Sequence, residues 1–285
     1  MIISTQTEAL GRYFNDETAI RMIAAAGFDA ADFSMFYMQD DDCPLLKADY
    51  REYVLRLKEI ADECGLFFNQ AHAPFPSCKP KDSEYTKRTF DKIVRAMETA
   101  SMLGVKNIVV HPTNVSPEEN FDYNIEFYNR LKPYCIEFGI KVALENMWGR
   151  DAEGHIVPNV CSVPDDFNRH LDALDSRYFT ACLDIGHCGL VGDSAPNMIR
   201  KMGHDRIKAL HVHDNNHIAD QHVFPFSEKI DWAETMKALG EISYDGDLTF
   251  EADNSLFNMP KSFAMNGLKY LHEIGLKLVS MMENS

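Results

Sequence analysis

Carboxylate and imidazole side chains recur along this chain, each at the end of a short apolar segment. They are His72, His111, Glu145, Asp184, His211 and Glu251. One such residue alone is usually just a hydrogen-bonded polar group or a helix cap. Charged and imidazole groups are costly in buried strands unless they are paired or hold a metal. Six in succession are poorly explained by capping, so the pattern predicts a divalent-metal site.

The apolar segments that carry these residues have the composition of buried strands. Each is rich in Val, Ile, Phe or Leu and is bounded by polar or turn residues. We expect eight strands: Met1–Ser4, Ala30–Ser34, Leu66–His72, Asn107–His111, Lys141–Glu145, Phe179–Asp184, Ile207–His213 and Leu248–Glu251.

Amphipathic patterns between these segments predict helices. The clearest covers Tyr50–Cys64, where apolar residues fall on one face, Asp49 and Glu52 suit an N-terminal capping box, and Gly65 suits the stop. Further helices are expected over Ser83–Leu103 and, approximately, over Asn15–Ala26, Asn120–Phe138, Pro164–Leu174, Ala195–Met202, Asp231–Leu239 and Lys261–Met281.

Eight strand–helix units in 285 residues predict an α/β fold, a single (β/α)8 TIM barrel in one domain over residues 1–285. A doubly wound sheet is disfavoured because no Gly-x-Gly-x-x-Gly follows the first strand. No linker or low-complexity tract divides the chain. Since TIM-barrel sites lie at the carboxyl ends of the strands, the polar strand ends should meet at one rim.

Composition limits the partners and the compartment. The chain has 28 basic and 44 acidic residues, a net charge of −16, which opposes non-specific binding to nucleic acid or anionic membranes. No apolar stretch is long enough to span a bilayer, and the N-terminus lacks the pattern of a signal peptide. Seven scattered cysteines without a Cys-x-x-Cys pair suggest free thiols. We therefore expect a cytoplasmic protein without membrane contact.

The ordered set of strand-end residues resembles the xylose-isomerase-like TIM-barrel superfamily. That superfamily includes sugar phosphate isomerases and epimerases and the endonuclease IV group (AP endonuclease family 2). The resemblance spans nearly the whole chain, from His72 to Glu251. It implies one divalent metal ion, Mn²⁺, Zn²⁺, Co²⁺ or Mg²⁺, with four ligands: Glu145, Asp184, His211 and Glu251.

Two histidines compete for the third ligand position. His211 and His213 lie on the same side of a strand, so alternation does not choose between them. The resemblance favours His211, which leaves His213, Asp220 and His222 as additional metal ligands or supporting residues. The family commonly continues with Pro-Gly-x-Gly, whereas this chain reads Pro-Phe-Ser-Glu over 225–228. That loop should fold differently, which puts the roles of Asp220 and His222 in doubt.

Such a metal can hold a ketose carbonyl and stabilise the enediolate formed when the adjacent C–H loses its proton. Resemblance to ketose epimerases assigns the proton transfers to Glu145 and Glu251. Substrate-binding candidates are His72, His111, His187 and Trp148. The loops after strands seven and eight lack a glycine-rich phosphate site, so a small, unphosphorylated sugar is favoured. The sequence thus predicts a metal-dependent sugar isomerase or epimerase.

Other activities use the same residues. Endonuclease IV relatives bind three zinc ions, and all nine of their ligand types have counterparts here: His72, His111, Glu145, Asp184, His187, His211, Asp220, His222 and Glu251. A phosphodiesterase acting on abasic DNA is therefore the main alternative, although the net charge makes nucleic acid an unfavoured partner. An inosose-type dehydratase would use the same enediolate. The complete ligand set disfavours a non-catalytic barrel. Related barrels often form homo-oligomers, but no interface is evident in the sequence.

Overall fold

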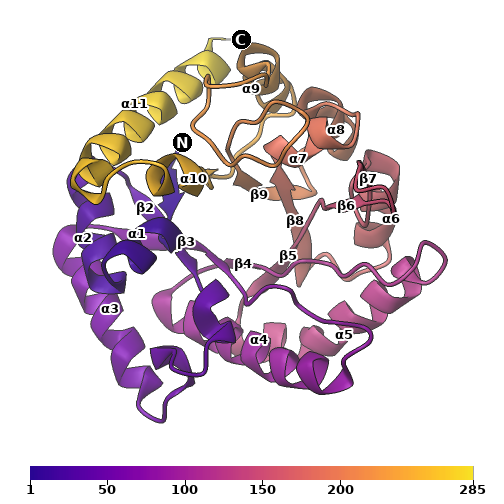
Figure 1. Ribbon diagram of the computed structural model, residues 1–285, viewed down its shortest axis with the longest axis horizontal. Helices are drawn as coiled ribbons and strands as arrows, with labels where there is room; N and C mark the ends of the chain where they lie inside the picture. Colours follow the sequence, from indigo (N-terminus) through magenta and orange to yellow (C-terminus); the bar gives the residue numbers. More distant parts are fainter. Residues whose placement is uncertain (285) are drawn as a thin grey trace.

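Short apolar runs form a ring of parallel strands in the computed structural model, which describes residues 1–284 (Figure 1). The eight strands of the ring in this range are β1 (Ile3–Gln6), β2 (Ala30–Ser34), β3 (Phe67–His72), β4 (Asn107–Val109), β5 (Lys141–Glu145), β8 (Phe179–Asp184), β9 (Ile207–His211) and β10 (Leu248–Phe250). Their order is β10-β1-β2-β3-β4-β5-β8-β9. A bridge between Val212 and Phe250 joins the two ends. The predicted (β/α)8 TIM barrel is confirmed.

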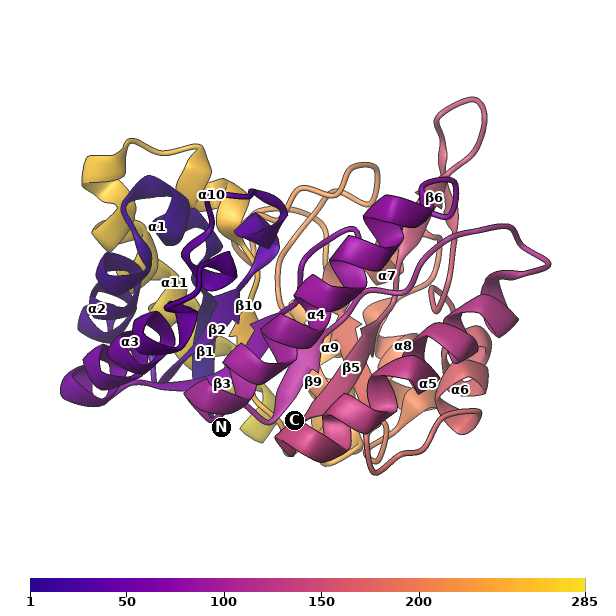
Figure 2. The same ribbon diagram turned by 90° about the horizontal axis from the view of Figure 1, so that it is seen from below.

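Helices surround the ring (Figure 1). They are α1 (Glu8–Tyr13), α2 (Asp16–Ala26), α3 (Tyr50–Cys64), α4 (Ser83–Leu103), α5 (Asn120–Phe138), α6 (Pro164–Asp172), α7 (Ile185–Leu190), α8 (Ala195–Met202), α9 (Trp232–Glu241), α10 (Asp253–Phe257) and α11 (Ala264–Glu283), with 3₁₀ turns at Phe36–Gln39, Pro44–Leu46 and Lys261–Phe263. An antiparallel hairpin, β6 (Trp148–Arg150) and β7 (Ile156–Pro158), follows β5. Figure 2 shows it projecting from the barrel on the side opposite the chain termini.

The start and stop signals of α3 illustrate how local sequence sets these elements. Gly65 adopts a positive φ of 70° and ends the helix as expected, since glycine tolerates this conformation. Asp49 is the N-cap residue, but its side chain accepts no hydrogen bond from the described helix. Its ψ of 14° departs from the extended conformation that lets an N-cap side chain reach back to the helix. The predicted helix is therefore present without the predicted cap.

Several strand ends differ from the prediction. The first strand begins at Ile3, two residues later than expected. β4 ends at Val109 and β9 ends at His211, so His111 and His213 lie in the segments that follow these strands. After β9 the chain turns into an antiparallel bridge between Asp214 and Val223, which ends the parallel pairing. The short helices α1, α7 and α10 and the hairpin have weak periodic signals and were not predicted.

The barrel interior is apolar only in a small region. Val109, Ala143, Cys182 and Ala209 form a separate buried cluster contributed by β4, β5, β8 and β9. The larger core lies between the strands and the helices. Within residues 1–284, none of the helices has the length and hydropathy needed to cross a membrane, and the seven cysteines form no disulfide. The small residues inside the barrel leave space above them for polar side chains at the strand ends.

A buried carboxylate anchors the long loop after β9. Asp214 accepts hydrogen bonds from the backbone N–H groups of Asn215, Glu228 and Ile230, at 2.9 to 3.1 Å. It also accepts one from Nε1 of Trp232, at 3.1 Å. These four donors come from both ends of the segment over 215–232. Asp214 therefore closes this loop, which carries Asp220 and His222, onto the barrel.

Replacing Asp214 by Asn should destabilise the fold. An amide group has one acceptor oxygen, so two N–H donors would lose their partner, at a cost of roughly 2–4 kcal/mol in the free energy of unfolding. Urea denaturation measures this cost, and hydrogen exchange should quicken over 215–231. The exposed Asp205→Asn is the matched control and should change stability by less than about 0.5 kcal/mol. Equal effects of the two substitutions would contradict the anchoring role.

Candidate metal centre

Four buried donors converge at the carboxyl ends of neighbouring strands. Glu145 ends β5, Asp184 ends β8, His211 ends β9 and Glu251 follows β10. One donor atom from each lies within 4.8 Å of the other three. Their exposed fractions are 7% or less. Segments far apart in the sequence thus bring three carboxylates and one imidazole to one point.

The distances within this group are those of donors that share an ion. Nδ1 of His211 lies 3.1 Å from Glu251 Oε2, 3.3 Å from Glu145 Oε2 and 3.7 Å from Asp184 Oδ2. Donors about 2.1 Å from a common metal lie roughly 3.0–3.4 Å apart. Neither ring nitrogen of His211 hydrogen-bonds to any described residue, although the side chain is fully buried. Such unsatisfied buried atoms are suited to binding a cation, and the donor set fits Mn²⁺, Mg²⁺, Co²⁺ or Zn²⁺.

The histidines decide the charge of the carboxylates. Burial alone would raise the pKa of Glu145, but His111 and His211 hold it well below its usual range. Burial likewise opposes ionisation of Glu251, yet His211, followed by His222 and His72, lowers its pKa. Both glutamates are therefore ionised at neutral pH. A charged carboxylate can bind a cation and can also accept a proton.

His211 responds to the same neighbours in the opposite sense. Burial opposes its protonation, but Cys182, Glu251 and Glu145 raise the pKa of the ring well above its ordinary value. In the metal-free protein the imidazolium therefore supplies the counter-charge. A metal ion would have to displace this proton, because a ligating histidine is neutral.

Asn146 holds Asp184 in place. Its Nδ2 donates to the carbonyl oxygen of Asp184 at 2.9 Å, and its Oδ1 accepts from the N–H of Asp184 at 2.7 Å. The carboxylate of Asp184 accepts from the N–H of His187, at 2.8 Å. Sequence reasoning did not identify Asn146. Its position directly after Glu145 was the available signal.

The two early histidines flank the group. Nε2 of His111 lies 3.0 Å from Glu145 Oε2. The ring of His72 stacks on that of His211, with centroids 4.4 Å apart. Asp32 Oδ1 accepts from His72 Nδ1 at 3.0 Å, which leaves Nε2 facing Glu251 Oε1 at 3.7 Å. Asp32 was also missed, although a carboxylate inside a buried strand met the criterion used for the other residues.

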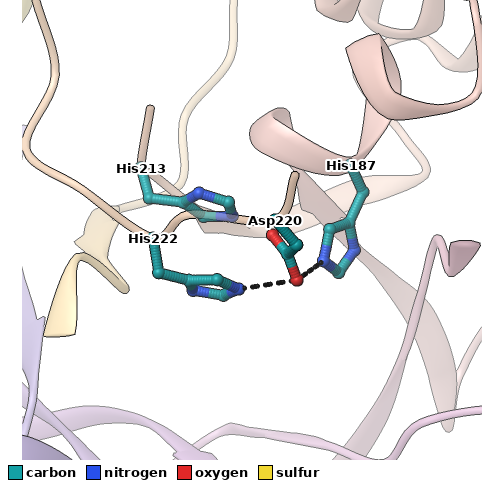
Figure 3. Close-up of side chains that lie close together, drawn as sticks. All are labelled: His187, His213, Asp220 and His222. Carbon is teal, nitrogen blue, oxygen red and sulfur yellow. Dashed lines mark hydrogen bonds and ion pairs between the residues drawn. The ribbon is translucent and has the colours of Figure 1, made fainter. Parts of the chain in front are cut away.

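A second cluster adjoins the first and consists of His187, His213, Asp220 and His222 (Figure 3). Asp220 Oδ2 lies between two imidazoles, 3.3 Å from His187 Nε2 and 3.1 Å from His222 Nε2. His213 stacks on His222 with ring centroids 3.8 Å apart. Its Nε2 lies 3.0 Å from both carboxylate oxygens of Asp184. His213 therefore connects the two clusters.

Charge pairing dominates this second cluster. Burial would raise the pKa of Asp220, but His187 and His222 lower it far below its usual value. Burial disfavours protonation of His222, yet Asp220 and Glu251 raise its pKa to about 10. The metal-free cluster is therefore a carboxylate held between protonated imidazoles. Asp220 and His222 belong to the cluster despite the unusual Pro-Phe-Ser-Glu loop that follows them, in which Phe226 adopts a φ of 69°.

Gly186 makes room for His213. A Cβ atom on this glycine would lie 2.1 Å from Cε1 of the His213 ring. No real side chain tolerates such an approach, so any substitution would displace the ring. The close approach arises between α7 and the segment after β9, and the sequence alone carried no signal for it.

Aromatic side chains lie next to the histidines. Trp148 in β6 is half-buried, and its Nε1 donates to Asp220 Oδ2 at 3.1 Å. The ring of Phe75 lies 4.6 Å from that of His111, and the ring of Phe36 lies 5.2 Å from that of His72. The structure thus brings every residue in the sequence-based site prediction to this rim: eight form the two adjoining clusters, and His72, His111 and Trp148 lie beside them.

Comparison with known proteins adds family information. The family model described as "Xylose isomerase-like TIM barrel" matches residues 20–274. Among curated proteins, the uncharacterized protein y4fM of Sinorhizobium fredii is 26% identical over 66% of this chain. The uncharacterized protein MJ1311 of Methanocaldococcus jannaschii is 30% identical over 64% of it. The matches span only 60% and 64% of the lengths of these relatives.

Solved structures share the fold over the full length. A D-tagatose 3-epimerase-like protein has a TM-score of 0.76 and 22% identity, covering 100% of this chain and 99% of its own. L-ribulose 3-epimerase has a TM-score of 0.74 and 16% identity, covering 99% and 96% of the two chains. D-psicose 3-epimerase, solved in the presence of D-fructose, has a TM-score of 0.73 and 14% identity, covering 98% and 99%. At these identities the similarity establishes the fold.

Loading the metal-depleted protein with Mn²⁺ should stabilise it. An ion that binds only the folded state, present at 100 times its Kd, adds about 2.7 kcal/mol and raises Tm by a few degrees. His211→Ala should abolish most of this gain because it removes the nitrogen ligand. His204→Ala, outside both clusters, should retain it. An equal gain in wild type and His211→Ala, measured by calorimetry, would place the metal elsewhere.

The metal-depleted protein should lose stability as the pH rises. A histidine whose pKa is raised on folding contributes fully below its unfolded pKa, about 6.5, and this contribution disappears as pH passes the folded value. For His222 the folded value is about 10, so the loss should extend between pH 6.5 and 10. Urea unfolding in EDTA at pH 6, 7.5 and 9 measures it. His222→Gln should flatten the profile; an unchanged profile would contradict this charge assignment.

Proposed function

This chain belongs to the xylose isomerase-like TIM barrel family, and we propose that it is a divalent-metal-dependent sugar isomerase or epimerase acting on a ketose. The observation that carries the proposal is the convergence of Glu145, Asp184, Glu251 and the unsatisfied imidazole of His211. The names of the structurally similar epimerases agree with a sugar as substrate. The proposed metal is Mn²⁺, Co²⁺, Zn²⁺ or Mg²⁺.

The reaction follows from the placement of the two glutamates. A divalent ion held by the four ligands would polarise a ketose carbonyl and stabilise the charge left when the neighbouring carbon loses its proton. Glu145 ends β5 and Glu251 follows β10, and these two strands lie on either side of β9 in the order of the ring. Because both are ionised, one carboxylate can take the proton and the other can supply one to the opposite face. Substrate stereochemistry decides which acts as the base.

The surrounding histidines would bind and orient the sugar. We assign hydrogen bonds with substrate oxygens to His72, His111 and His187, and ring packing to Trp148. His187 also contacts Asp220, at 3.3 Å, so it orients that carboxylate as well. The proposed substrate is unphosphorylated. The free cysteines agree with the cytoplasmic location expected from the sequence.

The second cluster favours a second candidate, a zinc-dependent phosphodiesterase similar to endonuclease IV. His187, Asp220 and His222 offer donors for a further ion, and His72 and His111 flank Glu145 and Glu251. Phosphodiester hydrolysis commonly uses such multiple-metal sites. Against it stands the net charge of −16, which repels a DNA backbone. An inosose-type dehydratase would use the same proton abstraction as the leading proposal.

Glu145→Gln and Glu251→Gln should each reduce proton exchange by 10²-fold or more, because an amide cannot accept the proton. The measurement is incorporation of deuterium from D₂O into a ketose such as D-fructose or D-tagatose, with the Mn²⁺-loaded enzyme. Glu273→Gln, on the exposed face of α11, is the control and should retain full exchange.

The same protein batch should be assayed on abasic DNA. Incision of abasic DNA without any exchange into sugars would overturn the isomerase proposal and favour the phosphodiesterase. Loss of water from a cyclic ketone, with exchange at the adjacent carbon, would identify the dehydratase. A circular dichroism spectrum and a metal content unchanged in both glutamine variants would show that lost exchange reflects lost proton transfer.

A further inference from the structure

We propose that a cavity beside the metal centre binds a second sugar ring, so that the substrate is a ketose carrying a glycosyl group. The inference rests on the proposed function for the reaction itself. The cavity has a volume of about 530 Å³ and is built by the segments after β3, β4 and β5. This size lies within the range of sites for small molecules, about 300–1,000 Å³.

The cavity adjoins the candidate active site, because residues of its wall contact residues of the site. Phe75 lines the cavity, and its ring lies 4.6 Å from that of His111. Nε2 of His111 in turn lies 3.0 Å from Glu145 Oε2. Trp148 forms another part of the wall and donates to Asp220. A group attached to a sugar at the metal centre would therefore extend past Phe75 and Trp148 into this space.

The lining has the chemistry of a carbohydrate site. Phe75 and Trp148 offer aromatic faces, while Thr113, Asn114 and Asn159 offer hydroxyl and amide groups. Aromatic rings pack against the apolar faces of sugars, and neutral donors and acceptors suit their hydroxyl groups. Although the chain has 44 acidic residues, no carboxylate lines the cavity among those the structure describes.

Ser77 supplies a specific polar anchor. This residue lines the cavity and is only 2% exposed, yet its hydroxyl oxygen has no hydrogen-bond partner among residues 1–284. Buried hydroxyl groups are normally satisfied, so this unpaired hydroxyl in the wall of the cavity could bond a ligand oxygen after a rotation of the side chain.

The lysines at the rim fit a neutral ring better than a phosphate. Lys79 and Lys81 line the cavity and form no ion pair with other described residues. Nζ of Lys79 lies over the ring of Tyr85, 4.2 Å from its centroid, and Lys79 and Lys81 are both exposed. Neither lysine is buried against the cavity as a phosphate-binding cation would be. Their ammonium groups can donate to sugar hydroxyls.

The test compares D-fructose with isomaltulose, a fructose unit that carries a glucosyl group, and with D-fructose 6-phosphate. Deuterium exchange with the Mn²⁺-loaded protein gives kcat/KM for each. We expect isomaltulose to exceed D-fructose at least tenfold. Val115→Trp, which fills the cavity from its half-buried wall, should lower that ratio at least tenfold. Val191→Trp is half-buried outside the lining and should leave the ratio unchanged.

Equal or better use of D-fructose, a preference for the phosphate ester, or an equal loss for both sugars in Val115→Trp would overturn the inference. Binding measured by titration calorimetry separates this result from failure of the proposed function. If no sugar exchanges but isomaltulose still binds more tightly than D-fructose, and Val115→Trp removes that difference, the cavity assignment stands while the reaction is wrong. Absence of isomaltulose binding would refute the assignment directly.

Discussion

The mutual repulsion of three buried carboxylates is the constraint on which this barrel depends. Glu145, Asp184 and Glu251 place oxygen atoms within a few ångströms of each other in a region almost closed to water. Two unit charges 4 Å apart repel by roughly 4 kcal/mol even at an effective dielectric constant of 20. Folding such a group requires positive charge at the same point. A protonated His211 supplies one charge, and a divalent ion with a neutral His211 supplies two.

The other residues at this rim hold the three carboxylates and His211 in position. Parallel strands bring their carboxyl ends to one side of the barrel, which places residues from β5 to β10 together without any local sequence relationship. Small residues such as Ala143 and Ala209 fill the interior below them. Asn146 fixes the backbone at Asp184, while Asp214 closes the loop that delivers Asp220 and His222.

The sequence predicted what depends on strand periodicity and side-chain type. All four proposed ligands lie at or next to strand ends. They could be predicted because a charged or imidazole side chain is costly in an apolar segment and therefore indicates a site. Gly186 and Ser77 could not be predicted in this way, since their importance arises from contacts between segments distant in the chain. Asp32 could have been found by the criterion that found Glu145. The hairpin formed by β6 and β7 was missed because its strands, Trp-Gly-Arg and Ile-Val-Pro, contain no apolar run of the length seen in most of the segments predicted as strands.

The two clusters differ in which of their donor atoms are hydrogen-bonded, and this difference bears on the proposed reaction. In the second cluster Asp220 Oδ2 accepts from His187, His222 and Trp148, whereas Asp220 Oδ1 and His213 Nδ1 lack a hydrogen bond to any described residue. In the first, both ring nitrogens of His211 lack a hydrogen bond to any described residue, despite three carboxylates around the ring. Carboxylates and imidazoles that lie close together without hydrogen bonds are suited to sharing a cation. Those that hydrogen-bond to each other are suited to sharing a proton. Both clusters contain unpaired buried atoms, but the first combines three carboxylates with one imidazole, and this donor set agrees with the proposed one-metal sugar isomerase.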